Sequence, residues 1–141
     1  MKRRALVLVG LLLAGCTYYP TIEDIGGIRI RPQNGRAVRQ PTGLAVYMDL
    51  DSTGKYGDAL IGASSEISRN AVVVAAPGVE VAPGTPARLE VPGATLVRLM
   101  PQGTHIVLSE LTRPVVPGET VIVTVVFERL GRIGVPTKVV E

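Results

Sequence analysis

The residues of this chain that could bind a soft metal ion are its one histidine and a nearby methionine. His105 follows a turn at residues 101–104 and begins an apolar run, and Met100 stands directly before that turn. Imidazole and thioether groups suit copper, and a His-x-Met pair at a strand start would point both ligands to one side. Position 107 is valine, so we take His105 and Met100 as the candidate metal ligands. A structural role for a lone histidine near a loop is the alternative.

The sequence gives little support for a catalytic site. The sequence contains the residue types of a hydrolase triad, with His105 and the serines Ser64, Ser65 and Ser109. None of these serines lies in the Gly-x-Ser-x-Gly pattern of a nucleophile elbow. No glycine-rich loop leads from a strand into a helix, so a phosphate-binding loop is unsupported as well. We therefore predict that the protein is not an enzyme.

The charge of the chain is concentrated at its start. The whole chain carries +3, from 15 Lys and Arg against 12 Asp and Glu, and three of the cations are Lys2, Arg3 and Arg4. The rest of the chain is neutral by count, which argues against a nucleic-acid partner because such domains usually need a net basic face. The single cysteine excludes an internal disulfide and a cysteine-rich zinc site.

The N-terminal segment has the layout of an export signal. Basic residues at 2–4 precede an apolar run at 5–13, which is shorter than the about 20 apolar residues that span a bilayer. Leu13-Ala14-Gly15-Cys16 resembles the lipobox of bacterial lipoproteins. The resemblance implies cleavage after Gly15 and a diacylated Cys16 that anchors the chain on the extracytoplasmic side of the envelope, in the periplasm or at the cell surface. A plain signal peptide with an incidental cysteine is the alternative.

The remaining sequence predicts one all-β domain. Residues 44–51 alternate most clearly, with Leu44, Val46, Met48 and Leu50 on one face, as in a half-buried strand. A first strand at residues 28–31 is expected to stop at Pro32. Further strands are expected at 59–63, 71–76, 87–91, 96–100, 105–111, 120–128 and 133–140. Gly and Pro mark the turns between them, and no segment has a capped 3.6-residue period, so the pattern predicts a β-sandwich.

Three segments of this domain resemble the bacterial extracytoplasmic copper chaperones called PCuAC. The first segment contains Tyr47-Met48-Asp49-Leu50 and ends at Gly62-Ala63-Ser64-Ser65. The second is Leu99-Met100-Pro101-Gln102-Gly103-Thr104-His105, which is similar to the family's Leu-x-Pro-x-Gly-x-His. The third begins with Leu111-Thr112-Arg113-Pro114. The likeness spans residues 26–138 and implies a cupredoxin-like, Ig-like Greek-key β-sandwich.

The resemblance also implies a ligand and a partner. PCuAC proteins bind Cu(I) with two His and two Met, and this sequence keeps only His105 of that set. Val107 stands where the last Met belongs, and residues 67–84 contain no His, Met or Cys. We therefore expect at most weak or shared Cu(I) binding, completed by Met100, by an oligomer or by a cuproenzyme partner in the envelope. The alternative is a non-metal interaction or assembly lipoprotein that uses the same sandwich.

The expected organisation of the chain has three parts. Residues 1–15 form the signal peptide, residues 16–25 hold the lipidated Cys16 and a tether, and residues 26–141 form the PCuAC-like domain. The expected partners are a membrane, through the lipid anchor, and an envelope protein.

Overall fold

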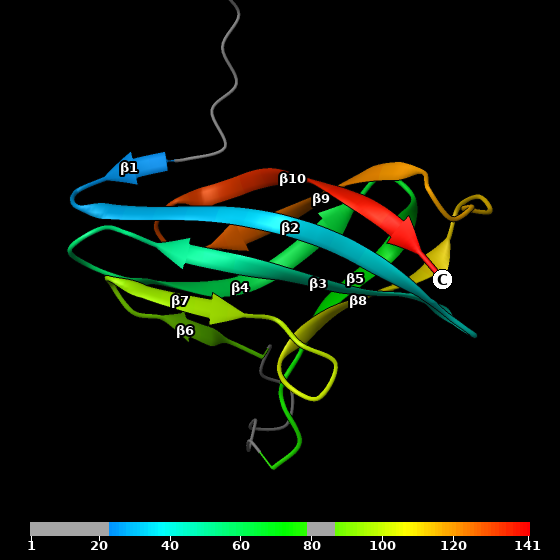
Figure 1. Ribbon diagram of the computed structural model, residues 1–141, viewed down its shortest axis with the longest axis horizontal. Coiled ribbons are helices and arrows are strands. Elements are labelled where there is room, and N and C mark those ends of the chain that lie inside the picture. The colour runs from blue at the N-terminus through cyan, green and yellow to red at the C-terminus, as the bar shows by residue number, and fades with distance from the viewer. Residues whose placement is uncertain (1–22, 79–86) are drawn as a thin grey trace, which may run out of the picture.

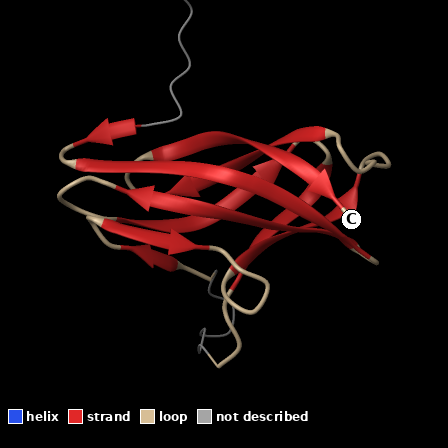
Figure 2. Cartoon of the chain, viewed as in Figure 1, coloured by secondary structure: helices blue, strands red, loops and turns tan. Residues whose placement is uncertain are grey.

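The computed structural model describes residues 23–78 and 87–141, and all regular structure in these ranges is β-strand (Figure 2). The strands are β1 (Glu23–Ile25), β2 (Ile28–Gln40), β3 (Gly43–Ser52), β4 (Asp58–Ser65), β5 (Ser68–Val74), β6 (Leu89–Val91), β7 (Thr95–Arg98), β8 (His105–Leu111), β9 (Thr120–Phe127) and β10 (Gly131–Val140). Within the described ranges, no helix could serve as a membrane span. The predicted all-β class is confirmed.

Seven of the strands form a sandwich whose strand path closes on itself. The path runs β2-β10-β9-β4-β5-β8-β3 and returns to β2, because β2 pairs with β10 on one edge and with β3 on the other. The β2–β10 pairing is parallel, whereas the other pairings along this path are antiparallel. Figure 1 shows β2 and β10 along the upper side, with β6 and β7 below. Closure leaves short strands at the edges: β1 pairs with β2, β6 with β4, and β7 with β3.

The core follows from alternation along each strand, because successive side chains point to opposite faces. Leu44, Val46, Met48 and Leu50 are fully buried, which confirms the inward face predicted for residues 44–51. The expectation of a half-buried strand is wrong for the first part of β3, because Ala45 and Tyr47 on the opposite face are buried as well. Strand β8 begins at His105 as predicted, and its second and fourth residues point into the core. The other fully buried large side chains include Ile30, Leu60, Leu99, Ile106, Leu108, Val123 and Phe127.

The expectation that Pro32 ends the first strand is wrong, because β2 continues through it to Gln40. One edge of β2 pairs with β1 only up to Ile30 and with β10 only from Gly35 onward. Pro32 lies between these two stretches, where no partner strand on that edge needs its missing N–H. On the other edge Pro32 pairs with Leu50 of β3, and the register shifts between Gln33 and Arg36. A proline inside a long strand is therefore tolerated at this gap.

Strand β1 lies in the segment that the sequence assigned to the tether. Glu23–Ile25 pairs with the first three residues of β2, through Glu23↔Ile30 and Ile25↔Ile28. The β1–β2 turn at Gly26 and Gly27 has positive φ at both residues, a conformation that glycine adopts without steric cost. The folded domain therefore begins three residues earlier than the predicted boundary at residue 26.

Candidate functional site

His105 lies on the outer face of the sandwich, at the start of β8. Its neighbour on β5 is Val74, and the pairing of Val46 with Ile106 brings Tyr47 of β3 to its other side. The side chain is half-buried, whereas Ile106 next to it is fully buried in the core. The alternation of β8 thus presents the imidazole outward from a rigid strand end.

The His105 ring is held in one orientation by its own turn. Nδ1 lies 3.0 Å from the Gly103 carbonyl oxygen, and a carbonyl can only accept, so Nδ1 carries the proton of this hydrogen bond. This leaves the Nε2 lone pair as the ring donor that could bind a metal ion. The geometry therefore supplies one oriented nitrogen donor at the surface.

Two side chains extend this site across β3 and β2. The Tyr47 and His105 rings are 5.8 Å apart between centroids and tilted by 51°. The Arg36 guanidinium carbon lies 5.6 Å from the Tyr47 ring centroid, a cation–π distance. The Tyr47 side chain is itself buried, covered in part by these two neighbours. The sequence carried no signal for the cross-strand register that joins the three residues.

Met100 lies in the same turn as His105, and its side chain is 48% exposed. The turn is closed by hydrogen bonds from the Gly103 N–H to the Met100 carbonyl, at 2.9 Å, and from the Met100 N–H to the Thr104 carbonyl, at 3.3 Å. No hydrogen bond of the described residues joins the Met100 sulfur to the His105 ring. Across residues 23–78 and 87–141, no group of three or more His, Cys, Asp or Glu is placed to hold a metal ion. Met48 is fully buried in the core and cannot reach the surface.

The other sequence candidates are not brought to His105. Ser109 stands four residues further along β8, about 13 Å away by the rise of a strand. Its hydroxyl accepts a hydrogen bond from the Asn70 amide at 3.1 Å, and the Ser65 hydroxyl donates to the Ile122 carbonyl at 2.9 Å. These hydroxyls have structural partners. Gly15 and Cys16 lie outside the described residues.

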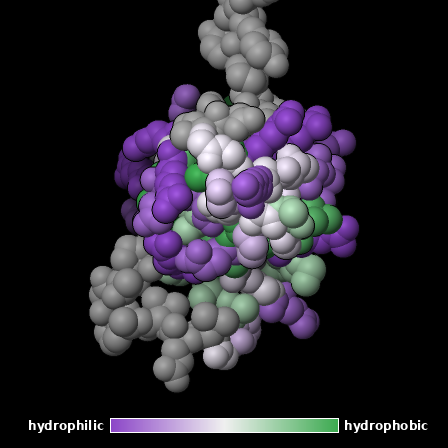
Figure 3. All heavy atoms as spheres, turned by 90° about the vertical axis from the view of Figure 1, so that its left-hand side faces the viewer, coloured by the Kyte–Doolittle hydropathy of each residue, from purple (hydrophilic) through white to green (hydrophobic). Residues whose placement is uncertain are grey.

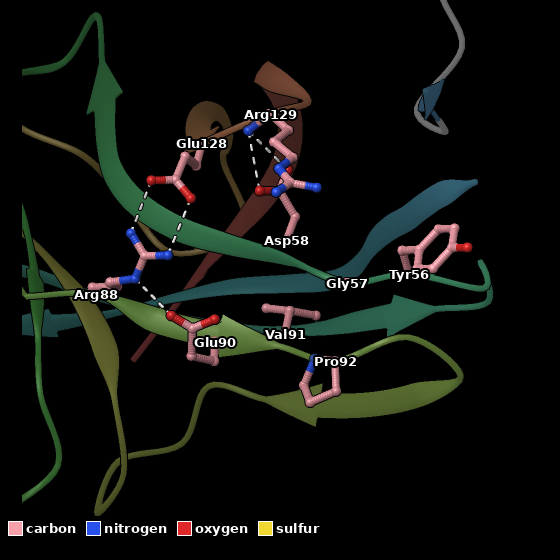
Figure 4. A pocket seen from close by; sticks show the side chains of 9 residues that line it. All are labelled: Tyr56, Gly57, Asp58, Arg88, Glu90, Val91, Pro92, Glu128 and Arg129. Atoms are coloured by element: carbon pink, nitrogen blue, oxygen red, sulfur yellow. Dashed lines mark hydrogen bonds and ion pairs between the residues drawn. The ribbon is translucent and has the colours of Figure 1, made fainter. Parts of the chain in front are cut away.

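A hollow of about 410 Å³ opens between β4, β6 and the β9–β10 turn (Figure 4). Arg88 lies between two carboxylates there: it donates to Glu90 at 2.6 Å and to both oxygens of Glu128 at 3.0 and 3.1 Å. The hydrogen bond from Arg88 and its positive charge lower the pKa of Glu128 below its ordinary value. Because both carboxylates already bind Arg88, this cation is neutralised and the hollow is no open anion site.

Asp58 forms the buried end of the same hollow. Its carboxylate accepts hydrogen bonds from the N–H groups of Arg129, at 3.0 and 3.1 Å, and Leu130, at 2.8 Å, as well as from the next residue, Ala59, at 2.8 Å. The side chain ties the β9–β10 turn to β4 across 72 residues of sequence. None of these residues was a sequence candidate. Their function is to hold strands together.

Comparison with known proteins identifies one family and several solved structures with a similar fold. The LpqE-like family model, described as "Putative lipoprotein LpqE-like", matches residues 24–139. A search of curated proteins found no match. Solved structures that resemble this fold include PCuAC domains. The apo PCuAC domain from PmoF1 is 21% identical with a TM-score of 0.66, covering 84% of this chain and 97% of that one.

Two further structures are similar at the same level. The copper-bound PCuAC domain from PmoF2 has a TM-score of 0.66 and 21% identity, over 84% of this chain and 97% of that chain. The solution structure of CuI-DR1885 from Deinococcus radiodurans has a TM-score of 0.60 and 22% identity, over 75% of this chain and 74% of that chain. At this identity the likeness shows the fold, which is the cupredoxin-like sandwich that the sequence predicted.

Proposed function

Because the chain belongs to the LpqE-like family and folds as a PCuAC domain, we propose that it is a lipid-anchored protein of the bacterial cell envelope that handles Cu(I) together with a partner. The observation that carries the copper part is the orientation of His105. Its Nδ1–H is bound to the Gly103 carbonyl, which leaves Nε2 of this partly exposed ring as the possible metal donor. No catalytic role is proposed, because the candidate serines do not meet His105.

The anchor in this proposal is Cys16. It is supported by the lipobox-like Leu13-Ala14-Gly15-Cys16 and by the lipoprotein family to which the chain belongs. The proposed organisation is a signal peptide at residues 1–15, a tether from residue 16 to residue 22, and the domain from Glu23 onward. Two or three acyl chains give a stable anchor, since each buried methylene contributes about 0.8 kcal/mol.

The anchor is tested by labelling with a palmitate analogue and by the mass of the mature chain. We expect label on the wild-type chain, none on the Cys16→Ser variant, and release of that variant from the membrane fraction. A labelled Cys16→Ser chain would contradict the proposed site, because this cysteine is the only one in the sequence.

The Cu(I) site in this proposal is incomplete in one chain. His105 gives one nitrogen, and Met100, exposed in the adjoining turn, is the soft sulfur on the same loop. The PmoF2 domain, which has the same fold, is copper-bound, and this is the reason to consider Cu(I) as cargo here. The remaining ligands would come from a cuproprotein partner, which makes the binding shared and weak in isolation.

A Cu(I) competition titration on the mature chain with Cys16→Ser tests this site, since that substitution removes the competing thiol. We expect His105→Ala to abolish binding and Met100→Leu to weaken it. Met48→Leu is the matched control, because Met48 is fully buried and the change is close to volume-conserving. Absence of His105-dependent binding at micromolar chelator strength would end the copper proposal.

A second candidate function is non-metal binding of an envelope protein. It is favoured by an apolar stretch beside the same site, where Val72 is 42% exposed on β5 and pairs with Val107 of β8. Crosslinking in cells with and without a copper chelator separates the two functions. A specific partner captured equally in both conditions would support this candidate over the first.

A further inference from the structure

The charges of the folded domain are separated between strands. The sequences of β2 and β10 contain six Arg and Lys residues and no Asp or Glu. From residue 5 onward the chain has as many acidic as basic residues, twelve of each, so the rest of it has twice as many acids as cations. The six cations are Arg29, Arg31, Arg36, Arg39, Arg132 and Lys138.

The two basic strands are neighbours, so their cations share one surface. β2 and β10 run parallel, and the register places Lys138 directly beside Arg36. All six side chains are exposed, and none forms an ion pair with a described side chain. The acidic residues nearest these strands include Asp51, in register with Arg31, Asp49, in register with Gln33, and Glu119, which precedes the register partner of Lys138. Arg36 and Lys138 are the neighbouring pair of cations on this basic face, and Arg132 lies about 20 Å from Lys138 along β10.

Like charges on adjacent strands repel, and an anionic partner would relieve this cost. Alternation keeps the basic side chains out of the core, because Ile133, Val135 and Val139 of β10 point inward. Of these cations, Arg36 also contacts the Tyr47 ring.

The position of the chain's entry into the domain indicates what this partner is. β1 is the first strand, and it pairs only with β2, one of the two basic strands. Glu23 lies seven residues after Cys16, so a fully extended connection spans at most about 25 Å. If Cys16 is acylated, as proposed above, the start of β1 stays within about 25 Å of a lipid surface, and β2 is the strand paired with it.

We infer that the outer face of β2 and β10 is the membrane-facing side of the protein and binds anionic phospholipid headgroups. Figure 1 shows β1 beside β2 and β10 on the upper side of the sandwich, and Figure 3 shows hydrophilic side chains flanking that end of the molecule. β5 lies across the closed path from β10, whereas only β3 separates His105 from β2, and Tyr47 of β3 contacts both His105 and Arg36. The inference rests on the proposed anchor and not on copper binding.

The test uses the acylated mature protein in bilayer nanodiscs, one set with one third phosphatidylglycerol in phosphatidylcholine and one set of phosphatidylcholine alone. A gadolinium chelate on a lipid headgroup broadens NMR signals of amides close to the bilayer. With phosphatidylglycerol, we expect the strongest broadening in β2 and β10 and the weakest in β5. The preference should vanish in phosphatidylcholine alone and in 1 M salt, where the Debye length falls to ~3 Å.

Matched double variants sharpen this experiment. Arg36→Gln with Lys138→Gln should reduce the preferred orientation by about fivefold for each cation removed, since each basic residue near an anionic surface contributes about 1 kcal/mol. Arg69→Gln with Arg129→Gln removes the same charge from exposed cations outside β2 and β10, and should leave the orientation unchanged.

Several results would overturn the inference. The first is equal broadening of the amide signals of all strands, and the second is broadening centred on another face. The third is an equal loss of preferred orientation in both double variants. A fourth outcome is a chain that shows no preferred orientation on the anionic bilayer but binds an acidic polypeptide through Arg36. This result would mean that the basic face binds a protein and not lipid. A mature chain without acyl groups, shown by its mass, would overturn the proposed anchor as well. An acylated chain without preferred orientation overturns the orientation alone.

Discussion

The surroundings of His105 and of Asp58 show two different uses of polar side chains on one sandwich. Asp58 is buried, and its carboxylate accepts hydrogen bonds from three backbone N–H groups of the molecule itself. His105 is half-exposed and uses only Nδ1 internally, toward Gly103. A polar group whose bonds are all internal holds the fold together, whereas one with an available donor atom can act on another molecule.

The largest expected effect is the loss of folding stability when Asp58 is replaced. Asp58→Ala leaves buried N–H groups of Arg129 and Leu130 without an acceptor, and each such group costs about 1–3 kcal/mol, so we expect a loss near 4 kcal/mol. Asp58→Asn keeps one acceptor oxygen and should lose about half as much. Urea unfolding measures both free energies. A loss below about 1 kcal/mol for Asp58→Ala would show that the turn does not depend on this carboxylate.

The next effect concerns the spacing of β3 and β8 at Ser109, four residues along β8 from His105. Gly43 of β3 faces β8, and a Cβ placed there would lie 1.9 Å from the Leu108 carbonyl oxygen. Gly43→Ala must therefore push β3 away from β8, and we expect a destabilisation of about 3 kcal/mol, at the upper end for overpacking. Gly78→Ala is not a suitable control because of its positive φ, so Gly62→Ala, with 3.8 Å of room to Val126, serves instead. Equal losses in the two variants would contradict the close-approach argument.

A smaller change should give His105 the partner that it lacks. Val107 points outward from β8 like His105, two residues along the strand, so Val107→Met restores the His-x-Met spacing. We expect Cu(I) affinity to rise about tenfold, or about 1.4 kcal/mol, in a competition titration. The same substitution in a His105→Ala chain should give no such gain. A gain without His105 would mean that the methionine binds copper elsewhere.

The smallest effect is the pH dependence of the Arg88 ion pairs, which are exposed and internally satisfied. Arg88 lowers the pKa of Glu128 in the folded state, so this contribution to stability is present above the ordinary pKa of 4.5 and is lost as pH falls through the lowered value. Arg88→Gln should therefore lose less stability than the wild type between pH 7 and about 3. Urea midpoints at both pH values measure this difference, with Arg69→Gln as the control. Identical acid sensitivity in wild type and Arg88→Gln would contradict it.

The sequence predicted the parts of the fold that depend on local pattern. Alternation at residues 44–51 gave the buried face of β3, and the start of β8 at His105 followed from the turn before it. It could not predict that β2 passes through Pro32, because the gap between β1 and β10 is set by pairing with distant strands.

The candidate site shows the same division. His105 and Met100 were visible as residue types, and their common turn was visible as a motif. The approach of Tyr47 to His105 and the bond from Arg88 to Glu128 depend on cross-strand register. Register is decided by the whole closed path of strands, and one sequence without its structure does not carry it.

Strand β1 also determines how the domain would respond to a mechanical load. If the anchor at Cys16 is pulled, the force enters at Glu23, and the three residue pairs of β1 with β2 separate one after another, like a zipper. Release of residues 23–27 would lengthen the connection between Cys16 and β2 by about 17 Å. β2 would then bear the load, and it is held by β3 on one edge and β10 on the other. β1 would therefore act as a short extensible link between the anchor proposed at Cys16 and the rest of the domain.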